Sequence, residues 1–134
     1  MAIYQINRMG PDAINALITL LTDDDPDARY GSARALGQIC NSYEVKGLDK
    51  ARAAKALVKA LSDTEPAVRY WSANALGKCK GQTAVEPLAE LLNDRHEGVR
   101  HQAQRSLQKI GGEKAEKILA DQDKKGLLGW LKGN

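Results

Sequence analysis

One pattern occurs three times along this chain and constrains the fold more than any other feature. The copies begin at Ala13, Ala53 and Ala84, and each carries the same order of leucines, an acidic turn and an alanine-rich stretch. They are offset by 40 and 31 residues, so nine extra residues separate the first copy from the second. Repetition at this period is typical of solenoids, in which each unit buries its apolar face only by stacking on a neighbour.

Each copy is predicted to form two helices joined by a short acidic turn. In the second copy, Ala53, Leu57 and Leu61 follow a period near 3.6 and form one apolar stripe, which indicates an amphipathic helix. Pro66 fits the first turn of the next helix, where its missing N–H would have no partner in any case. Gly77 lies near the end of that second helix, where a residue without a Cβ atom can stop the helix or allow close approach.

The repeat divides the chain into one domain and a tail. We expect an all-α repeat domain over residues 1–121 and a C-terminal tail over 122–134. The units expected within the domain are a half repeat over 1–10, repeat 1 over 11–40, an insertion over 41–49, repeat 2 over 50–80, repeat 3 over 81–111 and a half repeat over 112–121. The sequence does not say whether the chain is a fragment of a longer array, or what its oligomeric state is.

Composition agrees with closely packed helices. Ala and Leu make up about a quarter of the chain, aromatic residues only 4%, and Phe is absent. A β-sandwich or barrel would need more β-branched and aromatic residues, so this composition argues against one. No apolar run approaches the roughly 18 residues that span a bilayer. The first ten residues lack the pattern of a secretion signal.

The two cysteines lead to an expectation about the compartment. Cys40 and Cys79 lie far apart in the sequence, without a CxxC motif. This spacing argues against a disulfide framework or a thiolate zinc site and favours a reducing, cytoplasmic setting.

The repeats resemble a known family. The residues that carry the resemblance in the second copy are Leu57, Leu61, Asp63, Pro66, Val68, Arg69, Ala73, Ala75, Leu76 and Gly77. Residues 11–111 are similar to HEAT repeats, most of all to the short phycobilisome-lyase HEAT-like type. The resemblance implies a right-handed α-solenoid, an armadillo-type superhelix of antiparallel helix pairs, whose second helices line a concave face. It also implies a role in holding other proteins, while some members attach or remove bilin pigments.

An aspartate and an arginine stand six residues apart in every copy. The pairs are Asp23 with Arg29, Asp63 with Arg69, and Asp94 with Arg100. We interpret them as a structural ladder rather than an acid–base set: the carboxylate accepts hydrogen bonds at the start of the next helix, and the arginine bridges between units. HEAT repeats are known for such a ladder, which the resemblance therefore also implies.

No constellation for catalysis or metal binding is evident. His96 and His101 are five residues apart, not four as in a helical zinc pair. Deoxyhypusine hydroxylase, a HEAT-like di-iron enzyme, has several His-Glu pairs at the start of second helices, and the matching positions here do not supply them. We expect no catalytic residue, no cofactor and no metal. Cys40 could be an exposed thiol for bilin attachment or redox chemistry, but a helix-end structural role is favoured.

The second helices present a candidate binding surface. Rotation by 100° per residue places two rows of side chains opposite the buried stripe. The predicted partner-binding residues of the concave face are Tyr30, Arg34, Tyr70, Trp71, Asn74, Lys78, His101 and Arg105. Tyr, Trp and Arg dominate protein interfaces. The alternative is that Trp71 merely packs between units and the tyrosines cover apolar surface.

These features favour a non-catalytic scaffold that binds another protein of unknown identity. One alternative, implied by the resemblance alone, is a phycobilin lyase or lyase subunit acting on phycobiliproteins. A weaker one is nucleic-acid binding, for which a net charge of +3 is small. In the tail, Leu127, Leu128, Trp130 and Leu131 are expected to dock back over the last helix, or else to anchor a partner or a membrane surface.

Overall fold

The described secondary structure is helical throughout. The computed structural model describes residues 11–42, 45 and 47–133, so the half repeat expected over 1–10 lies outside the described residues. The α-helices are α2 (Pro11–Leu20), α3 (Pro26–Cys40), α4 (Leu48–Ala60), α5 (Pro66–Cys79), α6 (Val85–Glu90), α7 (Glu97–Ile110) and α8 (Glu113–Gly133). Short 3₁₀ helices, Gln82–Ala84 and Leu91–Asn93, flank α6.

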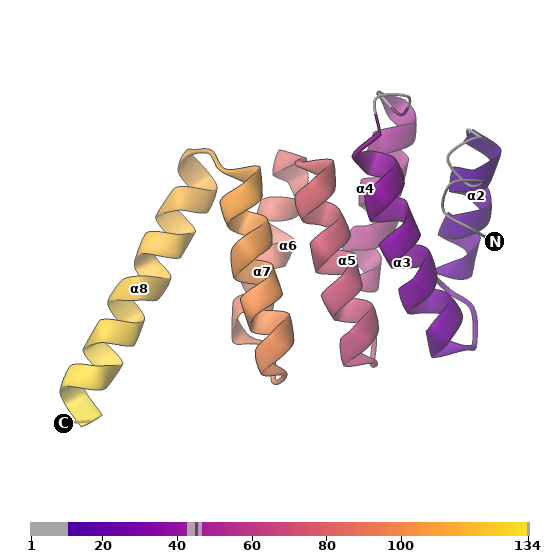
Figure 1. Cartoon of the computed structure of the whole chain (residues 1–134). Coiled ribbons are helices and arrows are strands. Elements are labelled where there is room, and N and C mark those ends of the chain that lie inside the picture. The colour runs from indigo at the N-terminus through magenta and orange to yellow at the C-terminus, as the bar shows by residue number, and fades with distance from the viewer. Residues whose placement is uncertain (1–10, 43–44, 46, 134) are drawn as a thin grey trace.

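The helices form two layers. Successive pairs stack side by side, with α3, α5 and α7 in one layer and α2, α4 and α6 behind them (Figure 1). We call the exposed surface of α3, α5 and α7 the second-helix face. This arrangement confirms the all-α solenoid predicted from the repeat.

The turns begin each second helix in a similar way. Pro26 and Pro66 occupy the first turns of α3 and α5, as predicted. Before α3, the Asp25 carboxylate accepts a hydrogen bond from the backbone N–H of Asp27 at 2.9 Å, which satisfies a donor that the helix leaves unpaired. Before α7, Glu97 takes the place of proline, so proline is not required there.

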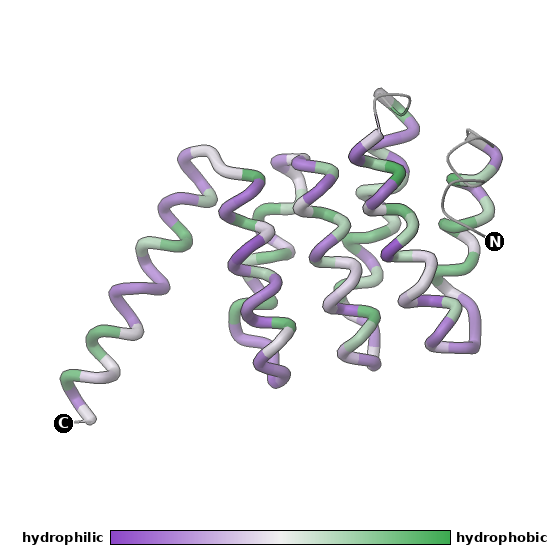
Figure 2. Tube along the Cα trace, in the orientation of Figure 1, coloured by the Kyte–Doolittle hydropathy of each residue, from purple (hydrophilic) through white to green (hydrophobic). Residues whose placement is uncertain are grey.

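The core lies between the two layers. Its fully buried side chains come from both layers of each pair, such as Leu57 on α4 and Leu76 on α5, each 0% exposed. Burying one such leucine contributes roughly 1.5–3 kcal/mol to folding. Apolar and polar segments alternate along each helix, as an amphipathic layer requires (Figure 2).

Glycine brings the second helices unusually close. A Cβ atom on Gly37 would lie 2.8 Å from Cα of Ala75, and one on Gly77 would lie 2.8 Å from Oγ of Ser106. By contrast, α2 and α4 share few contacts. The second helices therefore pack more closely on one another than α2 and α4 do.

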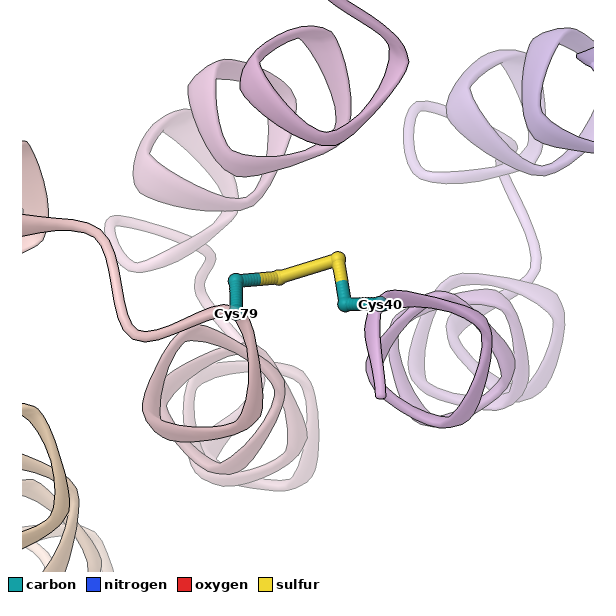
Figure 3. Close-up of a disulfide and its surroundings, with 2 residues drawn as sticks. All are labelled: Cys40 and Cys79. Atoms are coloured by element: carbon teal, nitrogen blue, oxygen red, sulfur yellow. A yellow bond between two sulfur atoms is a disulfide. The ribbon is translucent and has the colours of Figure 1, made fainter. Parts of the chain in front are cut away.

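A disulfide joins two neighbouring second helices, and the expectation against one was wrong. Cys40 at the end of α3 is bonded to Cys79 at the end of α5, with their Cα atoms 5.1 Å apart (Figure 3). Both cysteines are buried, so Cys40 is not the exposed thiol considered above. The physical reason is the stacking, which brings equivalent positions of adjacent repeats together. The pairing also removes the argument for a reducing compartment.

The C-terminal tail does not fold back. Instead, α8 continues without a break from Glu113 to Gly133 and projects away from the stack (Figure 1). Its four large apolar side chains near the end are exposed: Leu127 by 59%, Leu128 by 54%, Trp130 by 63% and Leu131 by 54%. The expected docking over the last helix is therefore wrong, because helix continuation carries these residues past the stack. No helix within residues 11–42 and 47–133 is long and apolar enough to cross a membrane.

Candidate functional site: the second-helix face

The Asp/Arg pairs lie at the edge where the turns meet the second helices. The guanidinium of Arg29 donates to both carboxylate oxygens of Asp63 in the next repeat, at 2.8 and 3.2 Å. Its third nitrogen donates to the carbonyls of Asp23 and Asp24 in its own turn. Arg69 repeats this geometry, with 2.8 and 3.0 Å to Asp94. Each arginine thus links its own turn to the next one.

The ladder ends at the third repeat. Arg100 donates to the carbonyls of Asp94 and Arg95, at 2.7 and 3.2 Å, and forms no ion pair within the described part of the chain. The pairing with Asp63 raises the pKa of Arg29, chiefly through the hydrogen bond. Partial burial acts to raise the pKa of Asp94, but the hydrogen bonds from Arg69 and from the His96 backbone outweigh it and lower that pKa. Both charges are therefore favoured in the folded chain.

An aromatic cluster lies on the second-helix face between α3 and α5. The rings of Tyr70 and Trp71 meet edge to face, with centroids 5.2 Å apart. The guanidinium of Arg34 on α3 lies over the Trp71 ring, 5.0 Å from its centroid, in cation–π geometry. Tyr70 and Trp71 are partly buried against the core and keep part of their surface exposed. Trp71 therefore packs against the core, as one interpretation expected, and its remaining exposed surface leaves partner binding a prediction.

The other predicted residues are spread along the same layer. Tyr30 is partly buried against the core, and Asn74 is half-buried. His101 is exposed, with its Nε2 4.0 Å from the carboxylate of Glu97. Arg105 is exposed on α7. The structure therefore joins Arg34, Tyr70 and Trp71 by direct contacts, while these four lie on the same helices outside that cluster.

A group of cations lies toward the far end of the face. Lys78 on α5 is half-buried, and its Cδ atom lies 3.5 Å from where a Cβ atom on Gly37 would be. This burial lowers the pKa of Lys78, and the nearby charges of Lys109 and Arg34 lower it further. Cations on the two neighbouring helices, α3 and α7, therefore act on Lys78.

Groups suited to metal binding or catalysis are few. Within residues 11–42, 45 and 47–133, no three side chains of His, Cys, Asp or Glu gather as a metal site would require. Ser72 on α5 is 0% exposed, and its hydroxyl has no hydrogen-bond partner among the described residues. A hydroxyl buried in this way is not accessible to a substrate.

The opposite layer contains a groove that the sequence analysis did not predict. It lies between α2 and α4, has a volume of about 810 Å³, and is lined by Ile18, Ala56, Lys55 and Lys59 among others. The insertion before α4 offered a signal, because extra residues in one repeat can separate the first helices. Of that insertion, Leu48 and Asp49 form the first turn of α4, and Leu48 is 83% exposed.

Comparison with known proteins identifies the repeats. A family model described as HEAT repeats matches residues 54–125, more than half of the chain, and a model described as HEAT repeat matches residues 13–43. No curated protein sequence shows a significant match.

Two solved structures are similar to the chain, both crystal structures of engineered proteins from the Northeast Structural Genomics Consortium. The first is 28% identical, with a TM-score of 0.65, and the match covers 89% of this chain and 58% of that chain. The second is 27% identical, with a TM-score of 0.63, and the match covers 81% of this chain and 30% of that chain. The chain therefore spans less than two thirds of either protein.

Proposed function

This chain belongs to the HEAT-repeat family, and we propose that it is a non-catalytic module that binds another protein through the second-helix face. HEAT repeats suggest a scaffold or interaction module. The contact residues proposed on this face are Tyr30, Arg34, Tyr70, Trp71, Asn74, Lys78, His101 and Arg105.

The observation that carries the proposal is the cluster of Arg34, Tyr70 and Trp71. A guanidinium on an indole ring and an edge-to-face aromatic pair are held in defined geometry on closely packed helices. Side chains ordered before binding lose less conformational entropy when a partner is bound. Trp, Tyr and Arg are also the residues that most often carry binding energy in protein interfaces.

The ladder supports this face from its edge. We assign Asp23, Asp63, Asp94 and their arginines a structural role, because their donors and acceptors are used within the chain. Side chains engaged in this way hold adjacent repeats in register, which keeps α3, α5 and α7 in one continuous surface. A partner would contact the neighbouring residues and not the ladder itself.

Affinity capture from a native lysate tests the proposal. The immobilised wild-type chain is compared with a Tyr70→Ala/Trp71→Ala variant, and with a Lys55→Ala/Lys59→Ala control in the groove between α2 and α4. We expect proteins captured by both the wild type and the control to be lost with the aromatic variant. Capture of the same proteins by all three chains would contradict the proposal.

A second variant covers the case in which the aromatic variant unfolds. Arg34→Ala changes an exposed side chain and removes the cation from the Trp71 ring. We expect it to weaken capture without changing the thermal midpoint by more than a few degrees. Neither the family matches nor the described residues provide an observation that favours the bilin-lyase alternative.

A further inference from the structure

The second helices α3, α5 and α7 carry more basic than acidic side chains. In the second helices, α5 contains no Asp or Glu, and α3 and α7 contain one each, Asp27 and Glu97, both in the first turn. Beyond the ladder arginines, the basic residues on these helices include Arg34, Lys78, Arg105 and Lys109, which we call the inner cations. The second-helix face is therefore positive beyond the first turns.

The described residues do not neutralise the inner cations. None of the four forms an ion pair with any residue in the described ranges, whereas Arg29 and Arg69 are each paired with an aspartate of the next repeat. Most other carboxylates in the described ranges lie in the turns, on α6 and on α8, whereas α4 is itself basic. The positive charge of this face is thus available to a partner.

Two of the inner cations lie close enough to Lys78 to affect its charge. Lys78 lies over Gly37 at the junction of α3 and α5, and the charges of Arg34 and Lys109 act on it from either side. Partial burial and this repulsion both disfavour the charged form of Lys78. An anion bound among the three would offset the repulsion and favour that charge.

The contacts of Arg34 favour a carboxylate over a nucleic-acid base. Its guanidinium occupies a face of the Trp71 ring, and Tyr70 meets that ring edge to face, so base stacking there would have to displace Arg34. The N–H groups of Arg34 have no hydrogen-bond partner among the described residues. A guanidinium over a ring can still offer its N–H groups as a fork for two carboxylate oxygens.

We propose that the partner segment recognised by the second-helix face is an acidic polypeptide whose carboxylates bind Arg34, Lys78 and Lys109. This inference rests on the proposed protein-binding function and names the chemistry of the ligand. Adjacent packed helices lie about 8–10 Å apart, so the path from α3 to α7 is roughly 16–20 Å. An extended segment of about six residues covers that length, and alternate side chains point to the same side.

Binding of a fluorescein-labelled octaglutamate peptide, followed by fluorescence anisotropy, tests the inference. We expect saturable binding that weakens as salt is raised, because exposed charges are screened. Lys78→Gln/Lys109→Gln should weaken it roughly tenfold, because it removes two of the three cations proposed to bind the carboxylates. The matched control is Lys55→Gln/Lys59→Gln on α4, which removes the same charge from the opposite layer and should change affinity less than about twofold.

Three results would overturn the inference: no saturable binding of octaglutamate, an equal loss in the α4 control, or tighter binding of a labelled oligothymidylate of equal charge. The partner captured in the preceding experiment separates this inference from the proposed function. Suppose that binding of this partner requires Tyr70 and Trp71, but that Lys78→Gln/Lys109→Gln binds it as tightly as the wild type. The inference of an acidic ligand is then contradicted, while the proposed binding face stands. Glutamine keeps most of the packing of Lys78, and a thermal melt checks that the variant is folded.

Discussion

The two layers of this solenoid use the same helical repeat differently. The second helices α3, α5 and α7 are joined by close glycine contacts, by a disulfide and, at their first turns, by Asp/Arg pairs that reach from one repeat to the next. The first helices α2 and α4 leave a groove of about 810 Å³ between them. Most of the cohesion between repeats therefore lies in one layer, and that layer also presents the aromatic and basic residues.

This difference indicates why the second-helix face suits recognition. Where the backbones of adjacent helices are so close that an added Cβ atom would clash, the helices have little freedom to slide past one another. The side chains of Arg34, Trp71 and Lys78 thus sit on a rigid support, although they come from two helices. Among the described residues, α2 and α4 are linked by a hydrogen bond from Arg52 to Asn15, but by no disulfide or ion pair, and we expect this layer to respond less to substitution.

Loss of the disulfide should have the largest effect on stability. Cys40 and Cys79 are separated by 39 residues, and closing a loop of that length is worth about 4 kcal/mol in the chain-entropy account. We expect Cys40→Ala/Cys79→Ala to lower the free energy of unfolding by about 2–4 kcal/mol, measured by urea denaturation. Reducing agent should destabilise the wild type and leave the variant unchanged. Equal responses of the two proteins would show that no disulfide forms in solution.

Removing a ladder arginine should come next. Arg69→Ala leaves the Asp94 carboxylate, only 8% exposed, without its guanidinium, so we expect a loss of about 3 kcal/mol in the free energy of unfolding. The control is Arg52→Ala on α4, whose side chain is 48% exposed and pairs with Asp49 at 3.4 Å. That change should cost less than about 1 kcal/mol. Similar losses for both would remove the distinction between the layers.

Two alanine substitutions on α3 should act in opposite directions. Gly37→Ala places a Cβ atom 2.8 Å from Cα of Ala75, a backbone atom that cannot move aside alone, and we expect a loss of about 1–3 kcal/mol. At Gly31 nothing lies within 4 Å of the added atom, so Gly31→Ala should stabilise by about 0.5–1 kcal/mol through helix propensity. Thermal melts of the two variants compare the signs directly.

Acid should weaken the ladder through Asp94. The pKa of Asp94 is lowered in the folded chain from its ordinary value of 3.8, so its ionised form is favoured by folding. That stability is present above the ordinary pKa and is lost as the pH falls through the lower folded value. Asp94→Asn should therefore show a shallower loss of stability below about pH 4 than the wild type. Asp121→Asn, which removes an exposed carboxylate on α8, is the matched control, and equal slopes for both variants would contradict this role.

Deletion of residues 124–134 should have the smallest effect. The apolar side chains of this part of α8 are 54–63% exposed, so little core is lost with them. We expect the free energy of unfolding to change by less than about 1 kcal/mol in urea denaturation. A loss above 2 kcal/mol would show that this end of α8 packs against the domain after all.

The sequence predicted those features that follow from repetition. The positions of the helices, the acidic turns and the close approach at Gly77 all derive from residues that recur with a fixed offset. The disulfide follows from the same offset, because Ile39 is the counterpart of Cys79 and Cys40 is its neighbour. Cys40 and Cys79 are 39 residues apart in the sequence, but the stacking of adjacent repeats brings them into contact.

Features outside the repeat could not be predicted in the same way. The continuation of α8 through the apolar tail has no counterpart in another repeat from which it could be inferred. The groove between α2 and α4 depends on how far two helices separate, which the residues on either helix do not encode. The rotation of 100° per residue predicted that Arg34 and Trp71 share one surface. Whether the two side chains touch depends on how their two helices are rotated about their axes.

Chemical-shift mapping by NMR tests the central claim most directly. The ¹⁵N-labelled chain is titrated with the partner recovered by affinity capture, and the perturbed backbone amides are placed on the structure. We expect perturbations centred on Arg34, Trp71, Lys78 and Lys109, with little change around Lys55 and Lys59. Perturbations centred on the groove between α2 and α4, with the second-helix face unchanged, would contradict it.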